Sequence, residues 1–493
     1  MVDLVRWRRG VPDARASGVA PQPAAHGAAP RPKILCLAGR LRACRGRGRA
    51  SLDKRLHGVE NHSNRSCNLG LLVRLGTGVG RGTVVLLTGV CSKGRFWLRS
   101  SLTTITLVVA AALLFPVNAL GSPRLIKGPS HAICGAPPAG SATCLISMVD
   151  GQVGASTPVG YTPSDLRSAY ALPTRKNAGA GQTVATVVAY DDPNAESDLA
   201  VYRAQFGLPP CTTANGCFRK VAQDGTSNFP PTGGKTSTLE ESLDIDVISA
   251  VCPNCHILLV EANTSKITDL GQAENTAAAL GATEISNSFG APESYKDLTY
   301  DTAYFNHPGV AITAGTGDTG YAGYNGYPAA SPYVTAVGGT SLVQDSSVAR
   351  GWSETAWSGA SSLCSDYESQ PLWQAANATI ASLCGNRATA DVSAVADPST
   401  GVAIYDTFGY FNGWLQIGGT SVASPIIASV YALAGNASST NGGSYPYAHS
   451  SALNDVVSGT NNNGNSCTSA LCVAQPGWDG PTGLGTPDGT GAF

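Results

Sequence analysis

The chain has 493 residues, of which 43% are hydrophobic and 13% charged, so it is long enough for a domain with a large buried core. Its formal net charge of -1 conceals an asymmetry: residues 1–100 carry 19 Lys and Arg against 4 Asp and Glu, whereas residues 101–493 carry 13 against 29. The acidic part excludes a nucleic-acid-binding surface and fits a protein that stays soluble outside the cell. The basic part lacks periodicity and does not predict a folded domain.

A secretory signal is predicted where the two parts meet. Lys93, Arg95 and Arg99 form its positive region, and an apolar stretch at 102–117 follows. Small residues then offer a cleavage site after Ala119. The alternative interpretation makes the apolar stretch a membrane anchor behind a basic cytoplasmic tail, but its 16 residues are short for a span.

The segment before this signal is interpreted as an overextended gene start. Met1 and Met148 are the two methionines of the chain, and a bacterial GTG or TTG start at Val84, Leu87 or Val90 would produce this arrangement. The expected organisation is a non-globular leader at 1–92, a signal peptide at 93–119, a short extension at 120–160 and one large folded domain at 161–493. The expected location is extracellular.

Ten cysteines follow the signal and form five near-neighbour couples: Cys134 with Cys144, Cys211 with Cys217, Cys252 with Cys255, Cys364 with Cys384, and Cys467 with Cys472. An even number in local couples predicts five short-loop disulfides. The CxxC couple at 252–255 is also typical of redox pairs and zinc sites. Because no second CxxC supplies further ligands, zinc is rejected.

Apolar β-type runs alternate with helical patterns beyond residue 120. Strands are predicted at 183–190, 256–261, 284–289 and 310–314, and helices at 195–206, 238–251 and 267–280. This alternation predicts an α/β fold with a parallel sheet covered by helices on both faces. Ligand sites then lie beyond the carboxyl ends of the strands. The Gly-, Asn-, Ser- and Thr-rich segments 436–444 and 461–493 are predicted to be surface loops.

A candidate nucleophile stands in the sequence GGTSVASP at 418–425. Ser421 follows two glycines at the start of an apolar helix, where its own N–H can bind an oxyanion. A structural N-cap serine is the alternative. A serine nucleophile needs a proton acceptor, usually a histidine. The exported part has four histidines, none in an HGTH-type context: His131, His256, His307 and His449.

Carboxyl groups supply the candidate base. Glu240 and Asp244 are four residues apart, so they share one face of a helix, and two carboxyl groups this close tune one another. The alternative is an ordinary solvated acidic face, which the apolar neighbours of this helix disfavour. Glu241 and Asp246 lack the four-residue spacing and are assigned to that ordinary role.

A third candidate is Asp318, in a Gly-rich turn directly after a predicted strand. At a strand end its carboxyl group points into the active-site crevice, and if burial keeps it protonated it can donate a hydrogen bond to an oxyanion. The alternative is an Asx-type turn residue.

Together these segments resemble the sedolisins, the serine-carboxyl peptidases with a subtilisin-like fold. The motifs YTPSDL at 161–166, ExxLD at 240–244, GDTG at 317–320, YPAASPYVTAVGGTSL at 327–342 and GGTSVASP occur in family order over about two-thirds of the chain. The resemblance implies that Ser421 is the nucleophile, Glu240 its general base, Asp244 the residue that orients Glu240, and Asp318 the oxyanion-hole acid.

The resemblance also implies a calcium site near the C-terminus. Asp455 and Asp479 would supply side-chain oxygens, and Val456, Gln475 and Gly477 backbone carbonyls, which are the hard ligands that Ca²⁺ prefers. The family usually has Gly where Gln475 stands. The chain also departs from the family in the length of the segment before the catalytic domain. The roughly forty residues between Ala119 and Tyr161 are too few for the large folded prodomain of typical sedolisins.

The expected function is a secreted, monomeric peptidase that hydrolyses polypeptides at acidic pH, as an endopeptidase or a tripeptidyl-peptidase. One alternative is a catalytically silent secreted protein that binds a cell surface or wall through the same fold. Another is a subtilisin-type protease that uses Asp191 or Asp192 with His256 and Ser421. The sequence around His256 argues against this alternative, because His256 directly follows a cysteine and begins an apolar strand.

Overall fold

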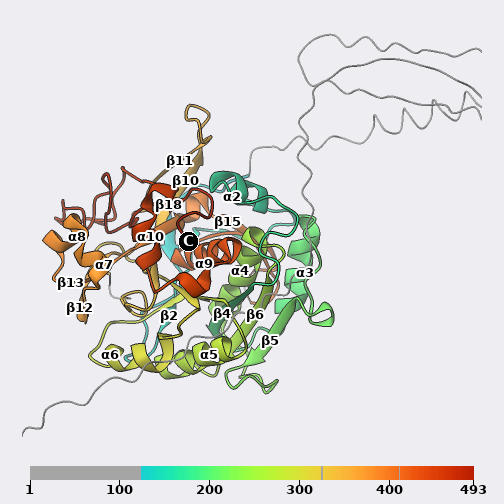
Figure 1. The fold of residues 1–493 in the computed structure, drawn as a ribbon. Helices are drawn as coiled ribbons and strands as arrows, with labels where there is room; N and C mark the ends of the chain where they lie inside the picture. Colours follow the sequence, from blue (N-terminus) through green and yellow to red (C-terminus); the bar gives the residue numbers. More distant parts are fainter. Residues whose placement is uncertain (1–123, 324–325, 410) are drawn as a thin grey trace, which may run out of the picture. The chain divides into compact units, whose positions relative to one another are not determined.

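The computed structural model describes residues 124–323, 326–409 and 411–493 (Figure 1). The predicted leader at 1–92 and signal peptide at 93–119 lie outside these residues. Within the described ranges, no helix is both long and apolar enough to cross a bilayer.

An eight-stranded sheet lies at the centre of the fold, in the order β11-β10-β9-β7-β4-β6-β5, with β14 also paired to β10. Its strands are β4 Thr183–Ala189, β5 Phe218–Ala222, β6 His256–Ala262, β7 Glu284–Asn287, β9 Ala311–Gly315, β10 Thr335–Gln344, β11 Trp352–Ala356 and β14 Val392–Val395. All neighbours are parallel except β10 and β11, which pair antiparallel.

Helices cover both faces of this sheet. The main ones are α3 Ala195–Gln205, α4 Lys235–Val251, α5 Ile267–Ala279 and α9 Thr420–Ala434. Alternate residues of β4 point to opposite faces. Val184 and Val188 pack in the core that contains α4 and α9, which lie side by side in Figure 1. Ala185 and Val187 pack in the core that contains α5. The predicted α/β fold is therefore confirmed.

Smaller elements surround the central sheet. The helices are α2 Pro163–Ala169, α6 Asp297–Tyr300, α7 Leu372–Ala375, α8 Ala378–Leu383 and α10 Ser444–Ala448. A second sheet has the order β1-β3-β16-β15, with β1 Ser130–Ala132, β3 Ser147–Val149, β15 Val402–Asp406 and β16 Gly413–Gly418. Three two-stranded pairs complete the described residues: β2 Thr143–Cys144 with β8 Phe289–Gly290, β12 Leu363–Ser369 with β13 Asn386–Thr389, and β17 Leu453–Asn454 with β18 Thr486–Pro487.

The C-terminal segment 461–493 is largely irregular, as predicted, and residues 463–466 are exposed as predicted, but the later part of the segment is buried, where the prediction was wrong. Residues 478–487 are buried without interruption, and the ring nitrogen of Trp478 donates a 2.8 Å hydrogen bond to the Ala390 carbonyl. Phe493 packs edge-on against Tyr431 of α9. The segment therefore closes the core that surrounds α9.

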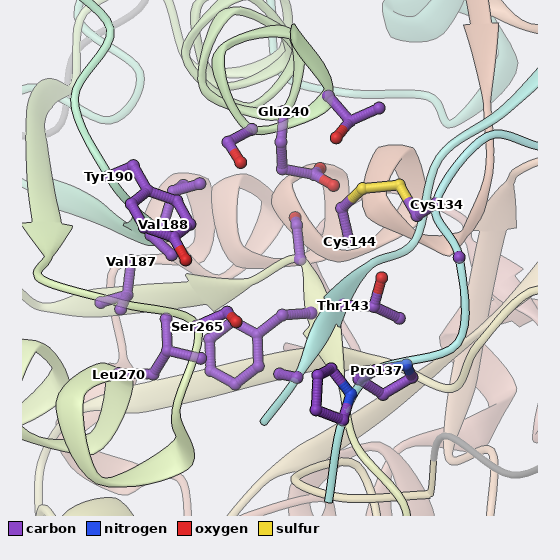
Figure 2. Close-up of a pocket in the computed structure, with 18 of the residues that line it drawn as sticks. Cys134, Pro137, Thr143, Cys144, Val187, Val188, Tyr190, Glu240, Ser265 and Leu270 are labelled. Atoms are coloured by element: carbon purple, nitrogen blue, oxygen red, sulfur yellow. A yellow bond between two sulfur atoms is a disulfide. The ribbon is translucent and has the colours of Figure 1, made fainter. Parts of the chain in front are cut away.

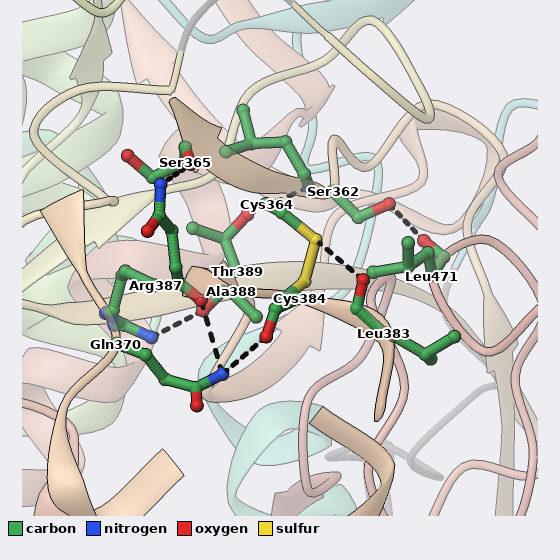
Figure 3. The surroundings of a disulfide bond; sticks show 12 residues. Ser362, Cys364, Ser365, Gln370, Leu383, Cys384, Arg387, Ala388, Thr389 and Leu471 are labelled. Carbon is green, nitrogen blue, oxygen red and sulfur yellow. Dashed lines mark hydrogen bonds between the residues drawn. A yellow bond between two sulfur atoms is a disulfide. The ribbon is translucent and has the colours of Figure 1, made fainter. Parts of the chain in front are cut away.

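All five predicted disulfides are formed. The bond between Cys364 and Cys384 ties β12 to the end of α8, and the Gln370 side-chain amide donates a 2.9 Å hydrogen bond to the Cys384 carbonyl (Figure 3). Cys252 and Cys255 are bonded at the amino end of β6. Such short staples suit a protein of oxidising surroundings.

Buried carboxyl groups are a second feature of this core. Glu241 and Asp246 of α4, assigned above to a solvated face, are buried, so that assignment is wrong. Loss of hydration raises their pKa values, because burial disfavours the charged form. The same cause raises the pKa of Glu274 and of Glu284 to about 8 each.

These groups make stability depend on pH with a defined sign. Each has a folded pKa above its unfolded value, so between about pH 4 and 8 the folded chain holds more protons than the unfolded chain. The contribution of these groups to the free energy of unfolding is therefore largest below about pH 4 and falls as the pH rises towards the folded pKa values.

We expect urea unfolding at pH 4 and pH 8 to show this loss, with Glu274 alone contributing on the order of a few kcal/mol. Glu274→Gln keeps the shape of the protonated carboxyl group and removes its titration, so its stability should depend less on pH. Glu196→Gln, at a partly exposed acid of α3, is the matched control. Stability that rises from pH 4 to pH 8 in the parent chain would contradict this assignment.

Candidate active site

Ser421 lies in the first turn of α9, where the sequence forces a sharp entry into the helix. β16 ends at Gly418, and Gly419 adopts a positive φ of 105°, which only glycine takes without strain. A Cβ atom at Gly418 would also lie 2.4 Å from the Ala396 carbonyl oxygen. The strand-to-helix turn therefore requires both glycines of the GGTS motif, and it holds the serine at the amino end of the helix.

The Ser421 hydroxyl is part of a buried chain of hydrogen bonds. Its Oγ donates to Glu240 Oε2 at 2.9 Å, and it also lies 3.1 Å from the Ser288 carbonyl oxygen. One turn along α4, Asp244 accepts a hydrogen bond from Ser288 Oγ at 2.7 Å and another from Thr186 Oγ1. The geometry thus joins α4, α9 and the carboxyl end of β7 at one point.

Asp318 lies on the other side of the serine, in the turn after β9. Its Oδ1 accepts hydrogen bonds from the backbone N–H of Thr420 at 2.8 Å and from Thr420 Oγ1 at 2.9 Å. Its Oδ2 accepts from Ser147 Oγ at 2.8 Å. The four candidate catalytic residues are therefore brought together around the amino end of α9.

Burial sets the protonation of these carboxyl groups. Glu240 is 2% exposed and Asp244 is 0% exposed. Loss of hydration raises the pKa of Glu240, the neighbouring Asp244 charge raises it further, and the Ser421 hydrogen bond opposes both effects. Burial likewise raises the pKa of Asp244 to about 7. Asp318 is less enclosed, yet lost hydration raises its pKa to about 7 as well. A protonated Asp318 below neutral pH can therefore donate a hydrogen bond.

The subtilisin-type alternative is not assembled. His256 is exposed and begins β6, while Ser421 meets Ser288 just beyond the carboxyl end of β7. Because the strands are parallel, these two positions lie at opposite ends of the strands. The distance between the two ends is about 20 Å, the length of a seven-residue strand. Asp192 is buried beside Glu241 and not beside a histidine.

Three supporting residues were missed from the sequence. Thr186 and Ser288 orient Asp244, and Ser147 binds Asp318. Ser288 lies near the carboxyl end of the strand predicted at 284–289, where ligand sites are expected, so its position was a usable signal. Thr186 and Ser147 stand in apolar runs and carry no comparable signal.

A cavity of about 300 Å³ adjoins the catalytic centre. Glu240 and the Cys134–Cys144 disulfide lie along one border of it, and Ser265 and Leu270 lie across from them (Figure 2). The carboxyl end of β4, at residues 187–190, forms a further wall. Its lining is mixed: the apolar side chains of Leu270 and Phe289 lie in the same cavity as the hydroxyl groups of Ser265 and Ser288.

The five residues of the expected calcium site also lie near one another. Asp455 Oδ2 accepts a 2.9 Å hydrogen bond from the Gly477 N–H, and Asp479 Oδ2 accepts one of 3.2 Å from the Gln475 N–H. Burial raises the pKa of Asp479 to about 7, and the nearby Asp455 charge adds to this. The carbonyls of Gln475, Gly477 and Val456 accept no backbone hydrogen bond within the described ranges.

Fold and site together define a subtilisin-like α/β protein with a serine–carboxyl centre. The chain is 30% identical over 373 residues to kumamolisin from Bacillus sp. (strain MN-32), covering 68% of this chain and 63% of that protein. It is 29% identical over 376 residues to sedolisin from Pseudomonas sp. (strain 101), covering 68% and 61%. The chain thus matches somewhat over three-fifths of the length of these relatives. No protein-family profile matches it.

A solved structure agrees with these matches. Pseudomonas sedolisin, a serine-carboxyl proteinase complexed with two molecules of pseudo-iodotyrostatin, superposes with a TM-score of 0.56 at 26% identity, covering 68% of this chain and 96% of that one. The two relatives and the solved structure support the sedolisin family, as the motifs predicted.

Proposed function

We propose that this chain is a serine-carboxyl peptidase that hydrolyses peptide bonds of polypeptides at acidic pH outside the cell. The observation that carries this proposal is the 2.9 Å hydrogen bond from Ser421 Oγ to Glu240 Oε2. Through this bond, the serine nucleophile has a carboxylate as its base instead of a histidine. The kinship with kumamolisin and sedolisin supports it, and five disulfides support an extracellular location.

Each group has a defined part in the proposed reaction. Ser421 Oγ attacks the carbonyl carbon and passes its proton to Glu240, which Asp244 orients. The oxyanion then receives hydrogen bonds from the Ser421 N–H and from protonated Asp318. Glu240 returns the proton to the leaving amine, and water releases the acyl group by the reverse sequence. No metal is needed for these steps.

The bond between Ser421 and Glu240 is tested by removing each partner. Ser421→Ala and Glu240→Gln should each lower kcat/KM on a peptide library by at least about a thousandfold, because they remove the nucleophile or its base. His256→Ala is the control and should retain the activity. Loss of activity in a folded His256→Ala chain would restore the subtilisin-type alternative.

The pH dependence follows from the two opposing requirements. Activity rises as the Glu240–Asp244 pair loses a proton and falls as Asp318 loses its proton, near the pKa of about 7 that burial gives this group. Burial raises the pKa values of Glu240 and Asp244 in the covered site, and hydration lowers that of Glu240 again once the site is open to substrate. We therefore expect an acidic optimum in kcat/KM measured from pH 2 to pH 8.

Asp318→Asn keeps a hydrogen-bond donor but cannot titrate. Its remaining activity should therefore decline less on the alkaline side than that of the parent chain. A parent optimum at neutral or alkaline pH would overturn the carboxylate mechanism.

We also propose that Asp455, Val456, Gln475, Gly477 and Asp479 hold a calcium ion. Two carboxyl groups and three backbone carbonyls form a hard oxygen donor set, which fits Ca²⁺. Within the described ranges, no cluster of three or more His, Cys, Asp or Glu side chains could hold a metal, so a cation here depends on main-chain oxygens. The ion would neutralise the two nearby carboxylates and stabilise the loops that carry them.

Added Ca²⁺ should raise the melting temperature of the Ser421→Ala chain, and a chelator should lower it, because an ion bound only to the folded form stabilises it by mass action. Asp455→Asn should abolish this response. Asp488→Asn, at an exposed acid of the same region, should leave it intact. Equal melting temperatures with Ca²⁺ and with chelator would remove calcium from this account.

A further inference from the structure

The helix that carries the candidate nucleophile contains a proline one turn after it. Pro425 lies inside α9, four residues beyond Ser421. In an α-helix the carbonyl of each residue accepts a hydrogen bond from the N–H four residues later, and proline has no N–H. The Ser421 carbonyl therefore lacks its regular helical donor. Because Ser421 is buried, this carbonyl needs a partner from another part of the fold.

Ser288 supplies that partner. Its Oγ donates to the Ser421 carbonyl oxygen at 3.2 Å, and the same Oγ lies 2.7 Å from Asp244 Oδ1. A serine hydroxyl has one proton to donate. The Ser288 hydroxyl therefore donates either to the Asp244 carboxyl group or to the Ser421 carbonyl, and the two acceptors compete for it.

The Ser421 hydroxyl has a matching choice of acceptors. Its Oγ lies 2.9 Å from Glu240 Oε2 and 3.1 Å from the Ser288 carbonyl oxygen. The two serines thus hold each other, hydroxyl to carbonyl in both directions, and each hydroxyl also faces one carboxyl group of the pair. Ser288 is 1% exposed and Ser421 is 0% exposed, so water does not compete for either proton.

The charge of the two carboxyl groups decides which acceptors receive these protons. Hydrogen bonds to an ionised carboxyl group are stronger than those to a neutral carbonyl. When the carboxyl groups are ionised, Ser421 therefore donates to Glu240, and Ser288 donates to Asp244. In this arrangement the proton of the nucleophile points at its base, and the Ser421 carbonyl gives up its donor.

Protonation of the carboxyl groups reverses both hydrogen bonds. A protonated carboxyl group has an O–H to donate, so Glu240 donates to Ser421 Oγ and Asp244 donates to Ser288 Oγ. Each serine proton then turns to the carbonyl of the other serine. This arrangement satisfies every group, including the carbonyl that Pro425 leaves without a helical donor. It cannot start the reaction, because the Ser421 proton points away from the base.

We propose that Ser288 is a positioning residue that passes the charge state of Asp244 to the backbone of the nucleophile. This inference rests on the proposed peptidase function. Thr186 also donates to Asp244, but Ser288 contacts Asp244 and Ser421 at once. Ser288 therefore sets the acidic limb of the pH profile, the range in which activity rises with pH.

The groups that face Asp244 come from three elements. Glu240 lies on the same helix, Thr186 comes from β4, and Ser288 lies directly after β7. Glu240 titrates with Asp244, and the charge of Asp318 acts on Glu240 from the turn after β9. Burial raises the pKa of Asp244, and the hydrogen bonds from Thr186 and Ser288 oppose this effect. Loss of the Ser288 hydroxyl therefore raises the pKa of Asp244 further.

Ser288→Ala tests this role. We expect the acidic limb of kcat/KM to move to higher pH by about one unit, because the ionised form of Asp244 loses a charge-assisted hydrogen bond. Ser286→Ala is the matched control: its hydroxyl is also buried, in β7, and lies 3.0 Å from Ser424 Oγ. This control should leave the limb in place. Equal shifts in the two variants would trace the effect to loosened packing and overturn the inference.

Pro425→Ala supplies the missing N–H and should act in the opposite direction. The Ser421 carbonyl then has a helical donor, so the protonated arrangement gains less from Ser288. We expect the acidic limb to move to lower pH, by on the order of half a unit, in a chain whose melting curve shows that it is folded. A limb that stays in place or moves to higher pH would contradict the competition for the Ser288 proton.

The double variant Ser288→Ala, Pro425→Ala tests the link between the two residues. Without the Ser288 hydroxyl there is no proton to share, so Pro425→Ala should no longer move the limb. Independent sites give effects that add. Two shifts that add in the double variant would therefore overturn the inference.

Failure of this inference can be told from failure of the proposed function. A parent chain that cuts peptides, with the same acidic limb in Ser288→Ala, overturns the inference and leaves the peptidase standing. A parent chain that cuts no peptide overturns the proposed function, and the titration of Asp244 is then followed by ¹³C NMR of the aspartate-labelled chain, assigned with Asp244→Asn. Ser288→Ala should raise the titration midpoint and Pro425→Ala should lower it. Equal midpoints in all three chains would overturn the inference.

Discussion

The hydrogen bond between Ser421 and Glu240 is the constraint on which this structure depends. It joins two helices, α4 and α9, that pack against each other over the central sheet, so both ends of the bond are buried. A carboxyl group cannot be buried cheaply without donors. The donors come from elements distant in sequence, namely Thr186 in β4 and Ser288 after β7, which bind the partner carboxyl group of Asp244. The sheet and both helices are therefore packed around one chain of buried hydrogen bonds.

The same requirement explains why part of the site could be predicted from the sequence. Glu240 and Asp244 share a helix face because of their spacing, and apolar neighbours showed that this helix would be buried. Ser421 follows a glycine pair that predicts a sharp turn. These signals are local. Strand β4 and helix α5 were predicted within a residue for the same reason, since their apolar periodicity is contained in their own segments.

The features that escaped prediction depend on contacts between distant parts of the chain. Ser147 and Asp318 are 171 positions apart in the sequence. They come into contact because β3 pairs with β16. The C-terminal segment is rich in turn-forming residues, which predict its irregular path but say nothing of what covers it. Trp478 and Phe493 were the available clues to its burial, because large aromatic side chains stabilise a fold mainly when they are removed from water.

Residues 143–149, which pair with β8 and β16 and place Leu145 on Ser421, also change the chemistry of the site that they cover. While Leu145 lies on Ser421 and Glu240, burial holds the pKa of Glu240 above its ordinary value, so the base is largely protonated in acid. Once a bound peptide can exchange with water, the carboxyl group regains hydration and its pKa falls. Asp318 keeps its two hydrogen bonds from Thr420 whether or not the segment is present, although Ser147, its third donor, belongs to that segment. Displacing this short segment would therefore both expose the Ser421 hydroxyl and favour ionisation of Glu240, so access to the site and the charge of the carboxyl group are coupled.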